Sequence, residues 1–539
     1  MDRGRESDVE VEARPRRPRR LHRPCRLASP TLIRRQIDSA PLAMGEGEAR
    51  RLRCCGEDRI SVLPDELLHC ILLRLGSTRA AVRTSVLSHR WRHVWAHLPE
   101  FVLGGGSGAP PPPASFLDSV DRILSTTCSS APTTMDRLSI SISLSTAARY
   151  DLGARAVFQA EAERVGAWLR FAAERVAGEL CLDMPQWNMR GHEWLELELP
   201  LCGRAKTITV DLRSTWLLRL PSAGLFTALT GLSIKYGRMK GSEVTALVGE
   251  QCPCLRDLAL NITTVDASAV SIRSDSLRSL WFSSITPASV QVEVVTPRLE
   301  KLSLFLPVAI RISAPKLAEL GWTGHHALVH QDHEFDHDSR RLRLLNIWDQ
   351  NCTMASSLMQ KFDEVDRLKL RINIPEVSTD GYARFLYETN KLPKCRILDI
   401  DLRSHQHSPA TCMLHLLRNC SSTKKVSMEL SSCFGRYACL SSCPCRLGEN
   451  RKVDCINVSS LEEVAINCYT SSPELLEFME LVSRCNATRL KKLTIDYNTY
   501  FHGTVETKEV RKKIYNMYQP NVEVEFYFNG PDQRRVRFD

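Results

Sequence analysis

Two segments of the sequence gather side chains that commonly bind metal ions. Histidine and aspartate side chains, and cysteine thiolates, are the usual protein ligands of zinc and other transition metals. The first cluster contains His325, His326, His330, His333 and His337, with Asp332, Asp336 and Asp338. The second contains Cys433, Cys439, Cys443, Cys445 and Cys455. Both clusters could in principle hold a metal ion.

The spacing within these clusters argues against that chemistry. The cysteines lack the C-x2-C pairs of structural zinc sites. The histidines and aspartates follow no established ligand pattern, and their flanks are typical of a polar loop. We therefore expect two solvated insertions, the second with free thiols, and no metal or cofactor.

Motifs of intrinsic catalysis are also missing from the sequence. It has no phosphate-binding glycine loop, no nucleophile elbow and no H-E-x-x-H pair. The sequence therefore predicts a non-catalytic protein.

Composition places the chain among globular proteins. Of its 539 residues, 43% are hydrophobic and 25% are charged, which is ordinary for a folded domain. No run approaches the roughly 18 apolar residues that a membrane helix needs. Twenty cysteines and a start without an apolar leader indicate a reducing compartment, so we expect the nucleus, the cytoplasm or both.

Positive charge is concentrated at the start of the chain. Residues 1–53 hold 14 arginines and 8 acidic residues, so +6 of the net +10 lies there. The arginine and proline run at residues 14–20 fits a nuclear import signal, a loose anionic contact or a plain disordered tail. The remaining chain is nearly neutral, which argues against a nucleic-acid partner.

Changes in composition divide the chain into five parts. Residues 1–57 are predicted to be a disordered Arg/Pro-rich tail, in which Met44 would make a plausible start for the folded protein. Residues 58–103 have a compact helical pattern, and residues 104–114 form a Gly/Pro linker. Residues 115–474 are repetitive, and residues 475–539 form a C-terminal part.

The repeat follows the pattern apolar-x-x-apolar-x-apolar. From Ala177 onward most spacings lie between 18 and 30 residues, and the longer gap after Met135 has room for a helix or a hidden repeat. The motifs begin at Met135, Ala177, Ala205, Leu229, Leu255, Leu277, Leu299, Leu317, Leu342, Val365, Cys395, Thr423, Leu461 and Leu490.

This period is that of leucine-rich repeats. Side chains alternate along a strand, so Leu258 and Leu260 share one face, and stacked units bury those faces in one core. We predict an α/β fold in which a small helical module precedes an irregular leucine-rich-repeat solenoid, a horseshoe with a parallel sheet on its concave face. The alternative is an ordinary α/β domain.

The module at residues 58–103 should contain three short helices. Pro64 suits the first helical position, and Gly76 ends the first helix. Ser77 and Ser88 are placed to cap the second and third helices. About 45 residues sit near the lower limit for a self-sufficient core, so we expect this module to be completed by a protein partner.

The module resembles an F-box. The match begins at Ile60 and continues through LPDELL at residues 63–68, Ile71 and Leu75, then AVRTSVLS at residues 81–88 and Arg90-Trp91. With the repeats behind it, the chain is similar to plant F-box/leucine-rich-repeat proteins. Residues 475–528 resemble the FBD-type C-terminus of that group.

The resemblance implies a role and its partners. F-box proteins are the substrate receptors of Skp–cullin–F-box ubiquitin ligases: the F-box docks on a Skp-type adaptor, which connects to cullin and RING subunits, and the distal repeats hold a protein substrate. The adaptor-facing candidates by motif match are Leu63, Pro64, Leu67, Ile71, Val86, Leu87 and Trp91. Packing inside the module is the alternative role for each, above all for Trp91.

Substrate contacts are expected on outward-facing positions of the strands. The substrate itself is unknown, and Lys301, Glu319 and Lys369 are the candidates. A repeat scaffold or decoy that binds ligands without assembling a ligase is the rival function. A nucleic-acid binder that uses the basic start of the chain is a third.

Overall fold

The computed structural model divides the chain into two compact units, Met1–Arg59 and Ile60–Asp539. The first unit, which includes the predicted Arg/Pro-rich tail, lies outside the described residues. The described part of the second unit consists of these ranges: 60, 63–104, 113–129, 134–142, 155–185, 194–213, 216–266, 268–285, 291–305, 310–324, 334–336, 340–349, 355–374, 381–403, 407, 409–430, 443, 456–468, 473–497, 505–529 and 535–537.

Three short helices open the second unit, as the sequence predicted. They are α1 (Asp65–Leu73), α2 (Thr78–Arg83) and α3 (Trp91–Val94), with 3-10 turns at Thr84–Val86 and Trp95–His97. Gly76 ends the turn after α1 with a φ of +67°, a left-handed conformation that favours glycine.

The caps of these helices differ in detail from the prediction. Pro64 is the N-cap of α1 rather than its first helical residue. Ser77 is the N-cap of α2 but makes no side-chain capping hydrogen bond. Arg90, not Ser88, is the N-cap of α3, because a turn at His89 and Arg90 separates Ser88 from that helix.

A strand joins this helical module directly to the repeats. β1 (Glu100–Leu103) pairs in parallel with β2 (Met135–Ser141), and the Val102 amide donates a hydrogen bond to the buried Thr78 hydroxyl of α2 at 2.7 Å. At Gly104, a β carbon would collide with the Ser141 carbonyl, so only glycine allows this approach. Gly104 is the first residue of the predicted Gly/Pro linker, and residues 105–112 of that linker lie outside the described residues.

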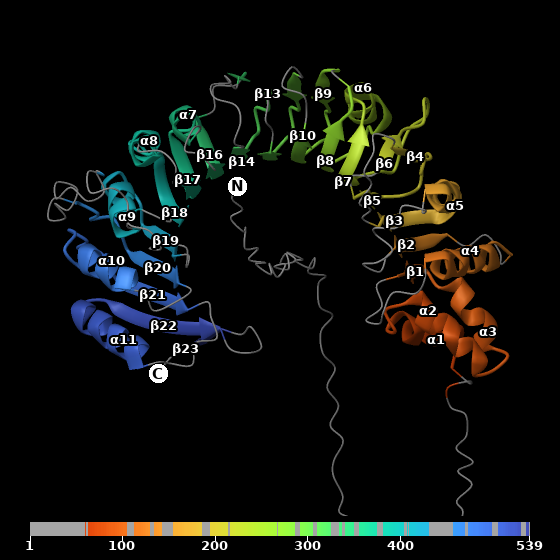
Figure 1. The fold of residues 1–539 in the computed structure, drawn as a ribbon, viewed down its shortest axis with the longest axis horizontal. Coiled ribbons are helices and arrows are strands. Elements are labelled where there is room, and N and C mark those ends of the chain that lie inside the picture. The colour runs from red at the N-terminus through yellow and green to blue at the C-terminus, as the bar shows by residue number, and fades with distance from the viewer. Residues whose placement is uncertain are drawn as a thin grey trace, which may run out of the picture. The chain divides into compact units, whose positions relative to one another are not determined.

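In the part of the chain that the structure describes, the repeats form one large sheet of 19 strands. Figure 1 shows its main strands succeeding one another along a curved sheet. After β2 these are β3 (Val176–Asp183), β5 (Thr207–Asp211), β7 (Gly231–Met239), β8 (Asp257–Thr264), β10 (Ser279–Ile285), β12 (Lys301–Phe305), β14 (Glu319–Gly324), β16 (Arg341–Asp349), β17 (Glu364–Asn373), β18 (Lys394–Arg403), β19 (Lys425–Leu430), β20 (Glu463–Cys468), β21 (Lys492–Tyr497) and β22 (Glu523–Asn529).

Each of these strands pairs in parallel with the next along the chain, which confirms the predicted solenoid. Each main strand from β2 to β21 overlaps one of the predicted motifs. The edge strand β23 (Arg535–Arg537) is antiparallel to β22.

Helices cover the outer side of the sheet toward both ends (Figure 1). The long gap after Met135 holds α5 (Arg155–Arg175), one of the two possibilities that the sequence left open. The other helices between strands are α4 (Pro113–Ser129), α6 (Gly241–Ala246) with a π turn at Leu247–Gln251, α7 (Ala355–Lys361), α8 (Gly381–Glu388), α9 (Pro409–Arg418), α10 (Pro473–Ser483) and α11 (Val505–Tyr518).

The middle repeats return by short strands instead of helices. β9 (Val270–Arg273), β11 (Val292–Val295), β13 (Ile310–Ser313) and β15 (Glu334–Phe335) form a second, four-stranded parallel sheet. A further pair, β4 (Leu195–Glu198) and β6 (Trp216–Arg219), precedes them. The sequence analysis did not foresee these strands.

Cysteines serve mainly as core residues. Those that the structure describes are free thiols, and most of them are buried. Burial raises the pKa of Cys181 and of Cys252 to about 12, so both thiols stay protonated at neutral pH. Such neutral thiols pack in the core as small apolar residues. Among the described residues, no helix is long and apolar enough to cross a membrane.

The alternation in β12 leads to a stability prediction. The Leu302 side chain is 1% exposed, whereas the side chain of its neighbour Lys301 is 54% exposed. Leu302→Ala should lower the free energy of unfolding by about 2–5 kcal/mol because it leaves a cavity between stacked repeats. Lys301→Ala should change it by less than about 0.5 kcal/mol. Urea unfolding checks both values, and equal losses would contradict the strand register.

Candidate interaction surfaces

Helix α1 has two apolar rows that point in different directions. Leu68 and Leu72 are fully buried against the module. Leu67, Ile71 and Leu75 are 50%, 40% and 46% exposed, although they are equally apolar and lie four residues apart. The second row therefore has no partner within the described chain and forms an apolar surface on a small module.

The turn after α2 adds two more exposed apolar side chains. Val86 is 86% exposed and Leu87 is 66% exposed. Ile60, just before the module, is 55% exposed. Leu63 is half-buried against the core, and Pro64 is exposed. Six of the seven predicted adaptor-facing residues are thus at least partly accessible.

Polar contacts fix these elements against one another. The Arg90 guanidinium binds the Asp65 carboxylate at 2.5 Å, which joins the start of α1 to the chain just after Leu87. On the other side of α1, the His69 ring donates to the carbonyl oxygen of Val94 at 3.1 Å. These contacts hold the elements that carry the exposed apolar residues in fixed positions.

Trp91 is the exception among the predicted contact residues. It is only 4% exposed and packs in the core with Val94 and Trp95. Its assignment to the contact surface is corrected: a large ring at the centre of three short helices supplies most of their shared packing. Conversely, Leu75 and Ile60 are exposed members of the match that the sequence analysis did not select.

The concave-side positions of the strands line up in rows from one strand to the next. Lys301 and Glu319 are register partners on β12 and β14, and their side chains form an ion pair at 3.6 Å. Glu319 also pairs with Arg343. Lys369 on β17 has no ion-pair partner among the residues that the structure describes. Of the three substrate candidates, Lys369 alone therefore offers an uncommitted charge.

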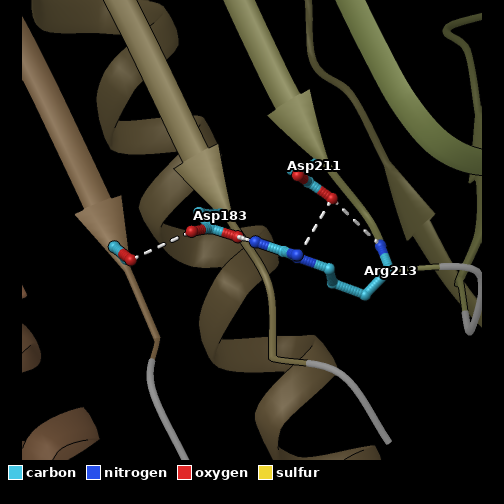
Figure 2. A network of polar contacts seen from close by, with 4 residues as sticks. Asp183, Asp211 and Arg213 are labelled. Atoms are coloured by element: carbon cyan, nitrogen blue, oxygen red, sulfur yellow. Dashed lines mark hydrogen bonds and ion pairs between the residues drawn. The ribbon is translucent and has the colours of Figure 1, made fainter. Parts of the chain in front are cut away.

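A charged network marks the same face in the early repeats. Figure 2 shows Asp183 of β3 and Asp211 of β5 on either side of Arg213, whose guanidinium lies 3.0 Å from Asp183 and 3.2 Å from Asp211. The Ser141 hydroxyl donates to the other oxygen of Asp183. Because each member has a partner, this network holds neighbouring strands together and offers no free charge.

The two metal-ligand clusters of the sequence fall largely outside the described residues. Only Asp336 of the first cluster and Cys443 of the second are described. Cys443 lies 3.5 Å from a ring nitrogen of His407. No group of three possible metal ligands occurs among the described residues.

Two family models match this chain, one over the helical module and one over the repeats. Residues 60–103 match the family model of the F-box domain, and residues 165–368 match that of the leucine-rich repeats of FBD-associated F-box protein At5g56370. The first match contains α1 to β1. The second runs from α5 into β17.

Individual relatives come from Arabidopsis thaliana. The putative FBD-associated F-box protein At5g56400 is 25% identical over 46% of this chain and 51% of its own length. The probable FBD-associated F-box protein At1g32375 is 27% identical over 46% of this chain and 56% of its own. F-box/LRR-repeat protein 25 is 60% identical over 8% of this chain and 16% of its own. The chain spans about half, or less, of the curated relatives it matches.

The two classes of apolar residue in the module should respond differently to truncation. Trp91→Ala should lower the free energy of unfolding by about 3–5 kcal/mol because it empties the centre of the core. Val86→Ala and Leu87→Ala should each change it by less than about 0.5 kcal/mol, since both side chains are mostly in solvent. Thermal melting of the full chain tests this, and a marked loss with Leu87→Ala would place that residue in the core.

Asp211 should make the stability of the folded protein depend on pH. Burial raises the pKa of Asp211 despite the lowering effect of Arg213. When the pKa of a carboxyl is higher in the folded state than its unfolded value of about 3.9, the folded protein loses stability as the pH rises from the unfolded to the folded pKa. Asp211→Asn should therefore gain in melting temperature relative to the parent between pH 4 and pH 7. A relative loss over that range would mean that the ion pair with Arg213 outweighs burial.

Proposed function

We propose that this chain, which carries an F-box domain followed by the leucine-rich repeats of FBD-associated F-box proteins, is the substrate-recognition subunit of a Skp–cullin–F-box ubiquitin ligase. The F-box docks on a Skp-type adaptor, and the adaptor connects to cullin and RING subunits. The repeats bind a protein substrate. We place this activity in the nucleus, the cytoplasm or both.

One observation carries the proposal: the exposed apolar surface of the F-box. Leu67, Ile71 and Leu75 form an unpartnered row on α1, and Val86 and Leu87 stand out from the following turn. Such side chains cost solubility unless a partner covers them. They lie inside the very segment that matches the F-box model.

The chain's own contribution to catalysis would be positional. The reactive thioester is held elsewhere in the ligase, so this subunit only has to bring a substrate lysine near it. Holding two reactants together replaces a bimolecular encounter with an effectively intramolecular one. This role needs two separate binding surfaces and no catalytic side chain on the chain itself.

The rival is a scaffold or decoy that binds ligands through the repeats without a ligase. It would leave the apolar row on α1 without a partner, which is why the ligase subunit is favoured. Adaptor binding distinguishes the two functions.

The test is a quantitative binding assay between the full chain and a Skp-type adaptor. Val86→Ala/Leu87→Ala should weaken the complex by about 2–4 kcal/mol, as expected for truncated interface anchors. Leu63→Ala/Pro64→Ala should weaken it similarly. Because Val86 and Leu87 are mostly in solvent, the first variant should fold normally.

A matched control removes exposed side chains of the same two residue types from the repeats. Leu225 and Val265 are 51% and 40% exposed and lie outside the F-box. Leu225→Ala/Val265→Ala should bind the adaptor like the parent. Failure of the parent to bind, or equal binding by the Val86/Leu87 variant and the parent, would refute the docking assignment.

A further inference from the structure

An aromatic hollow interrupts the polar concave face between β10 and β16. Its volume is about 380 Å³, within the range of small-ligand and side-chain sites. Trp281, Phe305 and Trp348 contribute rings to its lining, and between them lie the small side chain of Ser303 and the bare backbone of Gly321. Trp281 is 41% exposed, an unusual state for the largest apolar side chain.

The strand register explains how the hollow arises. Trp281, Ser303 and Gly321 follow one another in a single row across β10, β12 and β14. Phe305 and Trp348 lie in the neighbouring row, two residues further along their strands. Small residues in the middle of the first row leave a depression, and the rings stand around it.

The Trp348 ring is held in place by a charged neighbour. The Arg371 guanidinium lies 5.0 Å from the centre of this ring, and it binds the Asp401 carboxylate at 2.6 Å. Trp348 also lines a second, more polar hollow that contains Lys369 and Asp399. The two hollows are therefore adjacent and share one wall.

Lys369 is the open charge of the second hollow. It stands in the same row as Gly321, two strands further on, with Asn346 between them. The neighbouring Asp399 binds Arg367 at 2.6 Å. Arg367 and Arg371 form the ion pairs with the two nearby aspartates, Asp399 and Asp401. The ammonium group of Lys369 therefore remains available for a carboxylate of a bound ligand.

We propose that these two hollows together bind an extended segment of the substrate protein, an inference that rests on the proposed function. An aromatic side chain of that segment fills the hollow over Ser303 and Gly321, and an acidic side chain three residues away pairs with Lys369. Strands about 4.8 Å apart place Lys369 roughly 10 Å from Gly321. A segment in polyproline II conformation covers that distance in three residues at about 3.1 Å each, and its three residues per turn bring the side chains at positions i and i+3 to the same face.

The experiment selects ligands without assuming a sequence. The full chain, in complex with its adaptor, is used to enrich a display library of random dodecapeptides. The enriched peptides should combine Trp, Phe or Tyr with Asp or Glu three positions away. Trp281→Ala should reduce their binding about tenfold, and Lys369→Glu should reduce it by a similar factor and abolish its salt dependence.

Matched controls remove a similar side chain from the other side of the repeats. Tyr387 is 67% exposed on α8, and Lys391 is exposed in the turn that follows. Tyr387→Ala and Lys391→Glu should bind the enriched peptides like the parent. Unchanged melting temperatures for all four variants would show that the losses arise at the hollows.

Two results would overturn the inference: enrichment of peptides without the aromatic and acidic pair, or equal binding to the parent and to the Trp281 and Lys369 variants. Adaptor binding, measured on the same variants, separates this inference from the proposed function. Loss of peptide selectivity with adaptor binding intact refutes only the substrate site. Absence of adaptor binding in the parent refutes the ligase role itself.

Discussion

Each strand of the large sheet places its apolar side chains directly beside those of the next strand, and the rest of the structure depends on this in-register stacking. Leu258, Leu280, Leu302 and Leu320 are successive partners across β8, β10, β12 and β14. All four are buried. A slip of one residue would turn each of them toward solvent. The same constraint decides which side chains reach the concave face, because side chains alternate along a strand and those between the buried positions point to the opposite face.

This constraint also explains which parts of the fold were predictable. A motif with two fixed apolar positions repeats often enough to be visible in one sequence, so the main strands of the large sheet from β2 to β21 were predicted. What lies between the strands depends on spacing. The repeats around β11 and β13 are only 22 and 18 residues apart, which is room for a short return strand, whereas spacings of 28 to 30 residues enclose α8, α9 and α10. Segments such as VEVV and IRIS also alternate, and they carry the β-branched residues that favour strands.

The candidate surfaces were less predictable, for two physical reasons. On α1, the buried Leu68 and the exposed Leu67 are adjacent, identical residues, and periodicity alone does not say which row meets the core. That choice is made by Trp91 and Trp95, which pack from a different helix and turn. The aromatic hollow joins Trp281, Phe305 and Trp348, residues that register brings together from three repeats. Strand parity could have placed Trp281 outward, since it stands between the buried Leu280 and Phe282. No local signal could have shown that Ser303 and Gly321 would lie beside it.

The junction between the F-box and the repeats bears on how a receptor of this kind would work. A flexible linker lowers the effective concentration of two tethered groups as its length grows. Here β1 is hydrogen-bonded to β2, and the Thr78 hydroxyl of α2 accepts a hydrogen bond from the backbone of β1, so the F-box and the first repeat are in direct contact. A bound substrate and a bound adaptor would thus be connected through a continuous sheet of paired strands. A mutation at this junction, for example at Gly104 or Thr78, would act on the geometry between the two surfaces while leaving the side chains of both unchanged.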